Sequence, residues 1–144
     1  MTTFRAYRID RNDDGIAAGF EQLTIDDLTA GNVVIKVSHS TINYKDALAA
    51  TGAAPILRRY PLNGGIDLAG VVEHSDDAEL QPGTPVLVNG CGLSETVDGG
   101  YAEYARVDSH GVVPIPEGMS AAEAMQIGTA GFTAALAIHR MEQN

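Results

Sequence analysis

The sequence is poor in cysteine and in positive charge. Its single thiol, Cys91, excludes an internal disulfide and any zinc site built from several thiolates. Nine basic residues stand against 19 acidic ones, a formal charge of −10, and such a surface repels nucleic acid and anionic membranes. No apolar run reaches the length of a membrane span, and the N-terminus lacks the apolar segment of a signal peptide. The sequence therefore predicts a cytoplasmic protein without nucleic-acid or membrane partners.

Glycine and proline are spread along the chain, 16 and 6 respectively, and they separate short β-branched or alternating segments. These segments predict strands at 4–9, 16–23, 32–38, 67–74, 85–89, 101–107 and 112–115. Asn43 and Gly52 would cap a helix over 44–50. A Ser120–Glu123 capping box opens a helix that Gly128 interrupts and that resumes over 129–141. The pattern predicts a mainly β domain, a small barrel or sandwich, with a helical C-terminal tail.

Five motifs occur in an order and at a spacing that resemble the N-terminal catalytic domain of the medium-chain dehydrogenase/reductases. They are Asn43–Asp46, Gly64–Val72, Gln81–Gly83, Gly99–Tyr104 and Ile127–Ala134. The resemblance implies a GroES-like fold, a partly open β-barrel. Asn43–Asp46 and Gly128–Ala134 further resemble the acryloyl-CoA reductase branch, whose members are also labelled quinone oxidoreductases. That branch implies zinc-free, NADPH-dependent reduction of an enoyl thioester, with hydride added at the β-carbon and a proton at the α-carbon.

The resemblance also implies a domain organisation. Residues 1–126 would form the GroES-like domain, and 127–144 a helix leading into a nucleotide-binding domain absent from this sequence. No G-x-G-x-x-G motif, which dinucleotide binding needs at a strand–helix turn, occurs in the 144 residues. We therefore expect a fragment of an enzyme about twice as long, inactive alone and weakly self-associating through its last helix. Two alternatives stay open: a quinone oxidoreductase, and a GroES-like binding or assembly module without chemistry.

Candidate catalytic residues lie in the first turn of the predicted helix. Tyr44 and Lys45 are donors suited to stabilising an enolate or delivering a proton. Asp46 is predicted either to orient a donor or to support the helix start. The small-molecule partner would be an acyl-CoA or a quinone.

Candidate cofactor contacts are implied by the resemblance at Asn43, Tyr44 and Thr129, the last two against the nicotinamide. Other roles fit as well: Asn43 as a helix cap or a substrate ligand, Tyr44 as a packing aromatic and Thr129 as a donor to its own helix. Zinc-dependent relatives carry cysteine at the position of Asn43 and histidine at that of Ile66. Neither an amide nor a hydrocarbon side chain is a useful zinc ligand, so we expect no metal.

Overall fold

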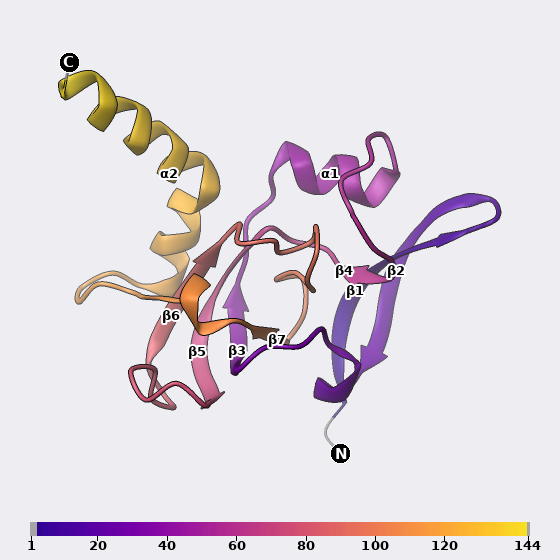
Figure 1. The fold of residues 1–144 in the computed structure, drawn as a ribbon, viewed down its shortest axis with the longest axis horizontal. Coiled ribbons are helices and arrows are strands. Elements are labelled where there is room, and N and C mark those ends of the chain that lie inside the picture. The colour runs from indigo at the N-terminus through magenta and orange to yellow at the C-terminus, as the bar shows by residue number, and fades with distance from the viewer. Residues whose placement is uncertain (1–2, 144) are drawn as a thin grey trace.

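Two antiparallel sheets lie next to each other in the computed structural model, which describes residues 3–143 (Figure 1). The smaller sheet has the order β2-β1-β4, formed by Gly15–Leu23, Phe4–Asn12 and Leu62–Asn63. The larger has the order β7-β3-β5-β6-β8, formed by Tyr104–Val107, Val33–His39, Asp67–Ser75, Pro85–Asn89 and Val113–Pro114. Within the described residues the sheets do not close into a barrel. The predicted mainly β fold is confirmed.

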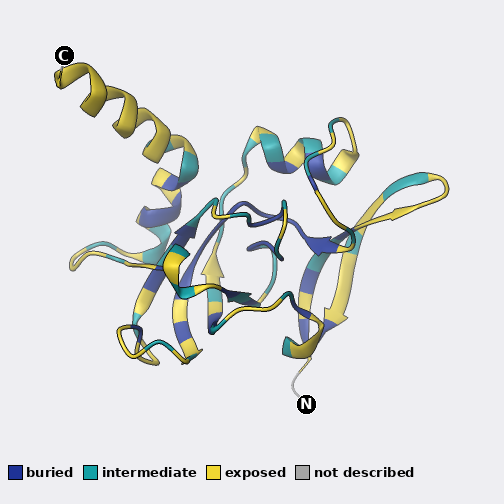
Figure 2. Ribbon diagram, viewed as in Figure 1, coloured by how far each residue is buried: buried dark blue, intermediate teal, exposed yellow. Residues whose placement is uncertain are grey.

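Each sheet builds its own part of the core. The β1–β2 hairpin pairs from Phe4–Leu23 to Asn12–Gly15 without a register break. Phe4 and Ile9 are buried on opposite faces of β1, in two separate clusters. The larger sheet contributes the main cluster of fully buried aliphatic side chains (Figure 2), which includes Val33, Ile35, Leu68, Val86 and Val88. The alternation of β-branched residues in the sequence thus marks the buried faces correctly.

The segment between Gly99 and Glu103 connects the two sheets, and here the predicted strand at 101–107 is confirmed for 104–107 and wrong for 101–103. Only 104–107 belong to β7. The Tyr101 N–H donates to Gly64 O at 2.9 Å, and the Glu103 N–H donates to Arg5 O at 3.0 Å. Residues 101–103 alternate like a strand, but they bond to β1 and to Gly64 until the Glu103 carbonyl accepts from Val37 of β3. The chain therefore changes sheets before β7 begins.

Two α-helices complete the domain, in addition to 3₁₀ turns at Ile25–Asp27 and Ser109–Gly111. Helix α1, Tyr44–Thr51, starts after Asn43 and ends at Gly52, whose φ of 69° is left-handed as the sequence predicts. Helix α2, Ala121–Glu142, is broken at Gly128 (φ 50°, ψ −163°), which confirms the predicted interruption. Beyond this kink α2 projects from the sheets and is largely exposed (Figures 1 and 2). Among residues 3–143, no helix is long and apolar enough to cross a membrane.

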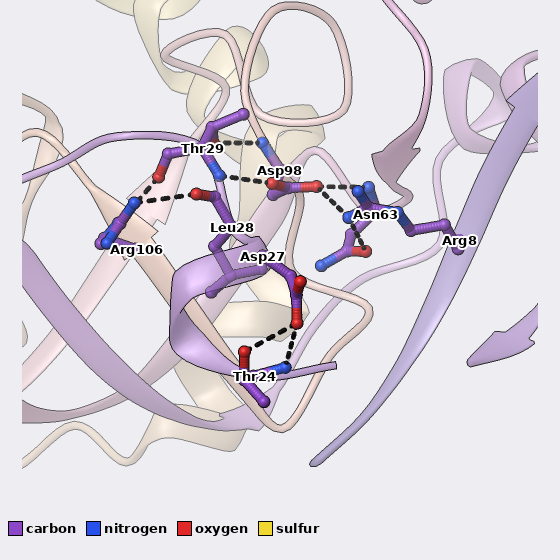
Figure 3. Close-up of polar contacts among 8 residues, drawn as sticks. All are labelled: Arg8, Thr24, Asp27, Leu28, Thr29, Asn63, Asp98 and Arg106. Carbon is purple, nitrogen blue, oxygen red and sulfur yellow. Dashed lines mark hydrogen bonds and ion pairs between the residues drawn. The ribbon is translucent and has the colours of Figure 1, made fainter. Parts of the chain in front are cut away.

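A buried carboxylate, Asp98, ties the smaller sheet to the chain that leads into β3 (Figure 3). It accepts from the Arg8 guanidinium at 3.0 Å, the Asn63 N–H at 2.8 Å and the Thr29 N–H at 2.7 Å. Arg106 donates to the carbonyls of Leu28 and Thr29 and thereby links β7 to the same segment. This network links β1 and β4 of the smaller sheet to β7 of the larger one.

Candidate functional site

The candidate site is organised around the carboxylate of Asp67, which opens β5 and is fully buried. It accepts hydrogen bonds from Thr41 Oγ1 at 2.6 Å, Asn43 Nδ2 at 3.0 Å and the Thr129 N–H at 3.1 Å. The Thr129 hydroxyl donates to its other oxygen. All four donors are neutral. A buried carboxylate is tolerated only when its oxygens are satisfied, so these bonds fix the positions of their donors.

Three segments far apart in the sequence meet at Asp67: the loop before α1, the start of β5, and α2 immediately after its kink. Gly128 makes this approach possible. Its φ of 50° is left-handed, and a Cβ at this position would lie 2.8 Å from Thr41 Cγ2 and 3.2 Å from Asp67 Oδ2. Glycine is therefore required both by backbone conformation and by space. The predicted motifs at 43–46 and 128–134 are indeed neighbours.

Asp46 lies in α1 and is 4% exposed. Its oxygens accept from the Ile66 N–H at 3.0 Å and the Asn43 N–H at 2.8 Å. This geometry agrees with support of the helix start, one of the two roles predicted for Asp46. Because both oxygens are engaged by main-chain donors, an action of Asp46 on a ligand would be indirect.

The side chain of Asn43 bridges the two carboxylates. Its Nδ2 lies 3.2 Å from Asp46 Oδ2 and 3.0 Å from Asp67 Oδ2. An amide that donates to two carboxylates from this nitrogen has no lone pair there for a metal, and the neighbouring Ile66 is a buried hydrocarbon. Among residues 3–143, no cluster of three or more His, Cys, Asp or Glu side chains is arranged to hold a metal ion.

Tyr44 and Lys45 face outward from the same helical turn. Tyr44 is 81% exposed, so it is not a packing aromatic within the described residues. The Lys45 ammonium lies 2.8 Å from Glu95 Oε2, and the Arg58 guanidinium 3.6 Å from Glu95 Oε1. The hydrogen bond and charge of Lys45, followed by Arg58, lower the pKa of Glu95 below its ordinary value. Glu95 is therefore a stable anion beside Lys45 at neutral pH.

Tyr101 adds a phenol that the sequence does not single out. Its hydroxyl donates to the Thr41 carbonyl at 2.7 Å. Burial first, and then the charge of Asp46, raise the pKa of Tyr101 well above its ordinary value, so it stays neutral. The ring also borders a mainly apolar cavity of about 460 Å³, lined by Tyr7, Phe20, Ile42, Asp46, Ala47, Ala50 and Tyr101.

The structure brings Asn43, Asp46 and Thr129 together around Asp67 and places Tyr44 and Lys45 on the exposed side of the adjoining helical turn. Asp67 and Glu95 are missing from the residues that sequence reasoning selects. One signal for Asp67 was present, because an aspartate that opens an otherwise apolar strand needs buried partners. No local signal marks Glu95, whose partner is 50 residues away.

Residues 29–117 match the family described as Alcohol dehydrogenase GroES-like domain. The chain belongs to this family, within the medium-chain dehydrogenases/reductases. The GroES-like chain is 44% identical to "Putative quinone oxidoreductase YhfP" of Bacillus subtilis over 99% of its length and 43% of the relative's. It is 40% identical to Acrylyl-CoA reductase AcuI of Ruegeria pomeroyi, over 98% of its length and 43% of that protein.

Solved structures agree with these sequence relationships. The yhdH oxidoreductase from Salmonella enterica, in complex with NADP, superposes with a TM-score of 0.93 at 42% identity, over 96% of this chain and 43% of that one. Bacillus subtilis yhfP with NAD bound also gives a TM-score of 0.93, over 100% of this chain and 44% of that one. The GroES-like chain thus spans less than half the length of these relatives.

Proposed function

We propose that this GroES-like chain is the substrate-side part of an NADPH-dependent reductase that saturates the carbon–carbon double bond of a short enoyl thioester such as acryloyl-CoA. The similarity to AcuI over nearly the whole chain supports the substrate class, and the NADP complex of yhdH supports the cofactor. Residues 1–126 would form the catalytic domain, and 127–144 the helix leading to a nucleotide-binding domain. The activity would belong to the whole enzyme.

The cofactor contacts would come from Thr129, Tyr44 and Asn43, and the hydrogen bonds at Asp67 fit this assignment. The Thr129 hydroxyl donates its proton to Asp67, so its remaining lone pairs can accept from an N–H group. The carboxamide of a nicotinamide offers such a group. When bound, NADPH supplies the hydride. Tyr44, exposed beside Asn43, would lie against the cofactor rather than in the protein core.

The observation that carries the proposal is the ammonium of Lys45, held by Glu95 on the exposed side of the first turn of α1. Reduction of an enoyl thioester leaves an enolate that needs a proton at its α-carbon. Lys45 can deliver this proton, because its ammonium carries three N–H donors. Asp46 and Asn43 would act indirectly by holding the helical turn from which Lys45 projects.

The alternative, a quinone oxidoreductase, rests on the name of YhfP. The test is to assay the full-length protein with NADPH against acryloyl-CoA and 1,4-benzoquinone separately. We expect kcat/KM to favour acryloyl-CoA by at least about 100-fold, because only that substrate needs a proton at carbon. Turnover restricted to quinones would favour the alternative. Elemental analysis of the same sample should find no stoichiometric zinc, and about one tightly held zinc per chain would contradict the zinc-free assignment.

Tyr44→Phe separates cofactor binding from proton transfer. We expect a raised Kd for NADPH with an unchanged rate at saturating cofactor, and a lower rate with an unchanged Kd would make Tyr44 the acid instead. The isolated 144-residue chain should show no turnover, since most of the cofactor's binding energy would come from the nucleotide-binding domain.

A further inference from the structure

The turn that follows β6 has an unusual backbone. Gly90, Cys91, Gly92 and Ser94 all have positive φ, and for the two non-glycine residues these values are 50° and 56°. Such conformations cost free energy and persist only where the surrounding structure imposes them. The turn is anchored accordingly. Leu93 and Ser94 are 2% and 0% exposed, and three N–H groups, those of residues 95–97, converge on the Gly92 carbonyl.

This turn carries Glu95, whose carboxylate lies beside two cations. One carboxylate oxygen accepts from the Lys45 ammonium at 2.8 Å, and the other lies 3.6 Å from the Arg58 guanidinium. The Glu95 carbonyl also accepts from the Arg58 N–H at 2.8 Å. Glu95 therefore connects α1, the loop before β4 and its own turn. The side chains of Lys45 and Glu95 are 43% and 30% exposed, so the pair is accessible to a ligand.

We propose that Glu95 is the positioning residue for Lys45 in the enoyl thioester reduction proposed above, on which this inference rests. A lysine side chain has four rotatable bonds, and a partly exposed one samples many positions. A carboxylate on a rigid turn, 2.8 Å from the ammonium, selects one of them. One oxygen of Glu95 accepts a single N–H bond of the Lys45 ammonium, and the other N–H bonds of this ammonium stay available to a substrate.

In the reaction the N–H bond of Lys45 breaks as a C–H bond forms at the α-carbon, and the electron pair for the new bond comes from the enolate. The neutral amine then takes a proton from water. The hydride at the β-carbon comes from NADPH, so atoms and electrons balance without another reactant. Glu95 gives and takes no proton in this step and acts only through the Lys45 nitrogen, 2.8 Å from its carboxylate. Its contribution is that the ammonium is already in place when the enolate forms.

The test is a double-variant cycle in the full-length protein, measured as the single-turnover rate on acryloyl-CoA with saturating NADPH. We expect Lys45→Met to lower the rate by at least about 100-fold and Glu95→Gln by about 10- to 100-fold. The double variant should be no slower than Lys45→Met within about twofold, because Glu95 acts only through Lys45. The Kd for NADPH should stay unchanged in all three.

Arg58→Gln is the matched control, since it removes the other cation from the same carboxylate. Its rate should stay within about twofold of wild type, and Glu95→Asp should recover part of the rate lost in Glu95→Gln. If Glu95→Gln lowers the rate by the same factor in wild type and in Lys45→Met, the positioning role is overturned. It is also overturned if Arg58→Gln lowers the rate as much as Glu95→Gln does. Either result leaves the proposed function intact. An inactive wild type would overturn both.

Discussion

Two aspartates, Asp98 and Asp67, are buried almost completely, at 1% and 0% exposure, but their surroundings differ. Asp98 is paired with a cation, Arg8, at 3.0 Å and accepts main-chain N–H groups from β4 and from the segment before β3 (Figure 3). Asp67 is held by hydroxyl, amide and main-chain donors without charge. We propose from this difference that Asp98 has a structural role and Asp67 a functional one.

The segments that each aspartate joins indicate its role. Asp98 connects β1, the β4 region and the chain before β3, none of which carries a predicted site residue. Asp67 connects the loop of Asn43 to the residue after the kink of α2, Thr129, and both are predicted cofactor contacts. We therefore expect substitutions of Asp98 to act on stability and those of Asp67 to act mainly on cofactor binding.

The largest effect on stability should come from Asp98→Asn. Removing the charge leaves the Arg8 guanidinium, whose side chain is only 11% exposed, without its buried partner, which typically costs about 3–5 kcal/mol. Urea unfolding measures this loss, with Glu117→Gln at an exposed turn as the control, expected to change stability by less than about 0.5 kcal/mol. A loss at Asp98 no larger than that of the control would remove the distinction between the two aspartates.

Asp67→Asn is the matched substitution. It keeps the shape but turns one acceptor into a donor, so we expect a smaller loss of about 1–3 kcal/mol. The amide of Thr129 should exchange faster with solvent, and the full-length protein should bind NADPH more weakly. If Asp67→Asn destabilises as much as Asp98→Asn and leaves the Kd for NADPH unchanged, Asp67 is purely structural.

Gly128→Ala tests the approach of α2 to the Asp67 site. The added Cβ would sit 2.8 Å from Thr41 Cγ2, and the backbone at φ 50° and ψ −163° is a conformation that costs a non-glycine residue about 1–3 kcal/mol. Gly19→Ala in β2, where a Cβ meets nothing within 4 Å, is the control and should be neutral or stabilising. Adding Thr41→Ser, which removes Cγ2 but keeps the hydroxyl, should recover part of the loss. No recovery would place the cost in the backbone alone.

The smallest expected effect is on the pH dependence of stability, through Glu95. Its pKa is lowered below the ordinary 4.5, mainly by Lys45. The stability it contributes is therefore present above that pH and is lost as the pH falls through the lowered folded-state pKa. Glu95→Gln should flatten this acid limb slightly, because the pair is partly exposed. Acid unfolding curves identical to wild type would mean that the pair does not persist in solution.

Much of the fold follows from local signals in the sequence. The alternation in residues 33–37, the cap at Asn43, the left-handed Gly52 and the interruption at Gly128 each depend on a few neighbouring residues, and each occurs as predicted. The change of sheet at residues 99–103 does not follow from local signals. The main-chain hydrogen-bond partners of this segment lie in strands β1, β3 and β4 and at the glycines after β4, far away in the sequence. A strictly alternating segment has the same appearance in either sheet.

The candidate site shows the same limit. Asn43, Asp46 and Thr129 were selected by motif resemblance, and the structure brings them together. Asp67, the partner that Asn43 and Thr129 share, lies 24 residues from Asn43 and 62 from Thr129, and Asp46 joins the group through Asn43. Such convergence is a property of tertiary packing, which local patterns do not encode. Glu95 was missed for the same reason, because its role depends on a turn that only the folded chain holds in place.

The measurement that tests the central proposal most directly is the position of deuterium in the propionyl-CoA that is formed in D₂O. Full-length protein is given acryloyl-CoA and unlabelled NADPH in D₂O, and the propionyl-CoA formed is analysed by NMR and mass spectrometry, with propionyl-CoA incubated alone as the exchange control. The proposal predicts a single deuterium at the α-carbon, delivered from the solvent-exchanged ammonium of Lys45, and none at the β-carbon, which receives hydride from NADPH. Deuterium at the β-carbon, or no propionyl-CoA while quinones are reduced, would contradict it.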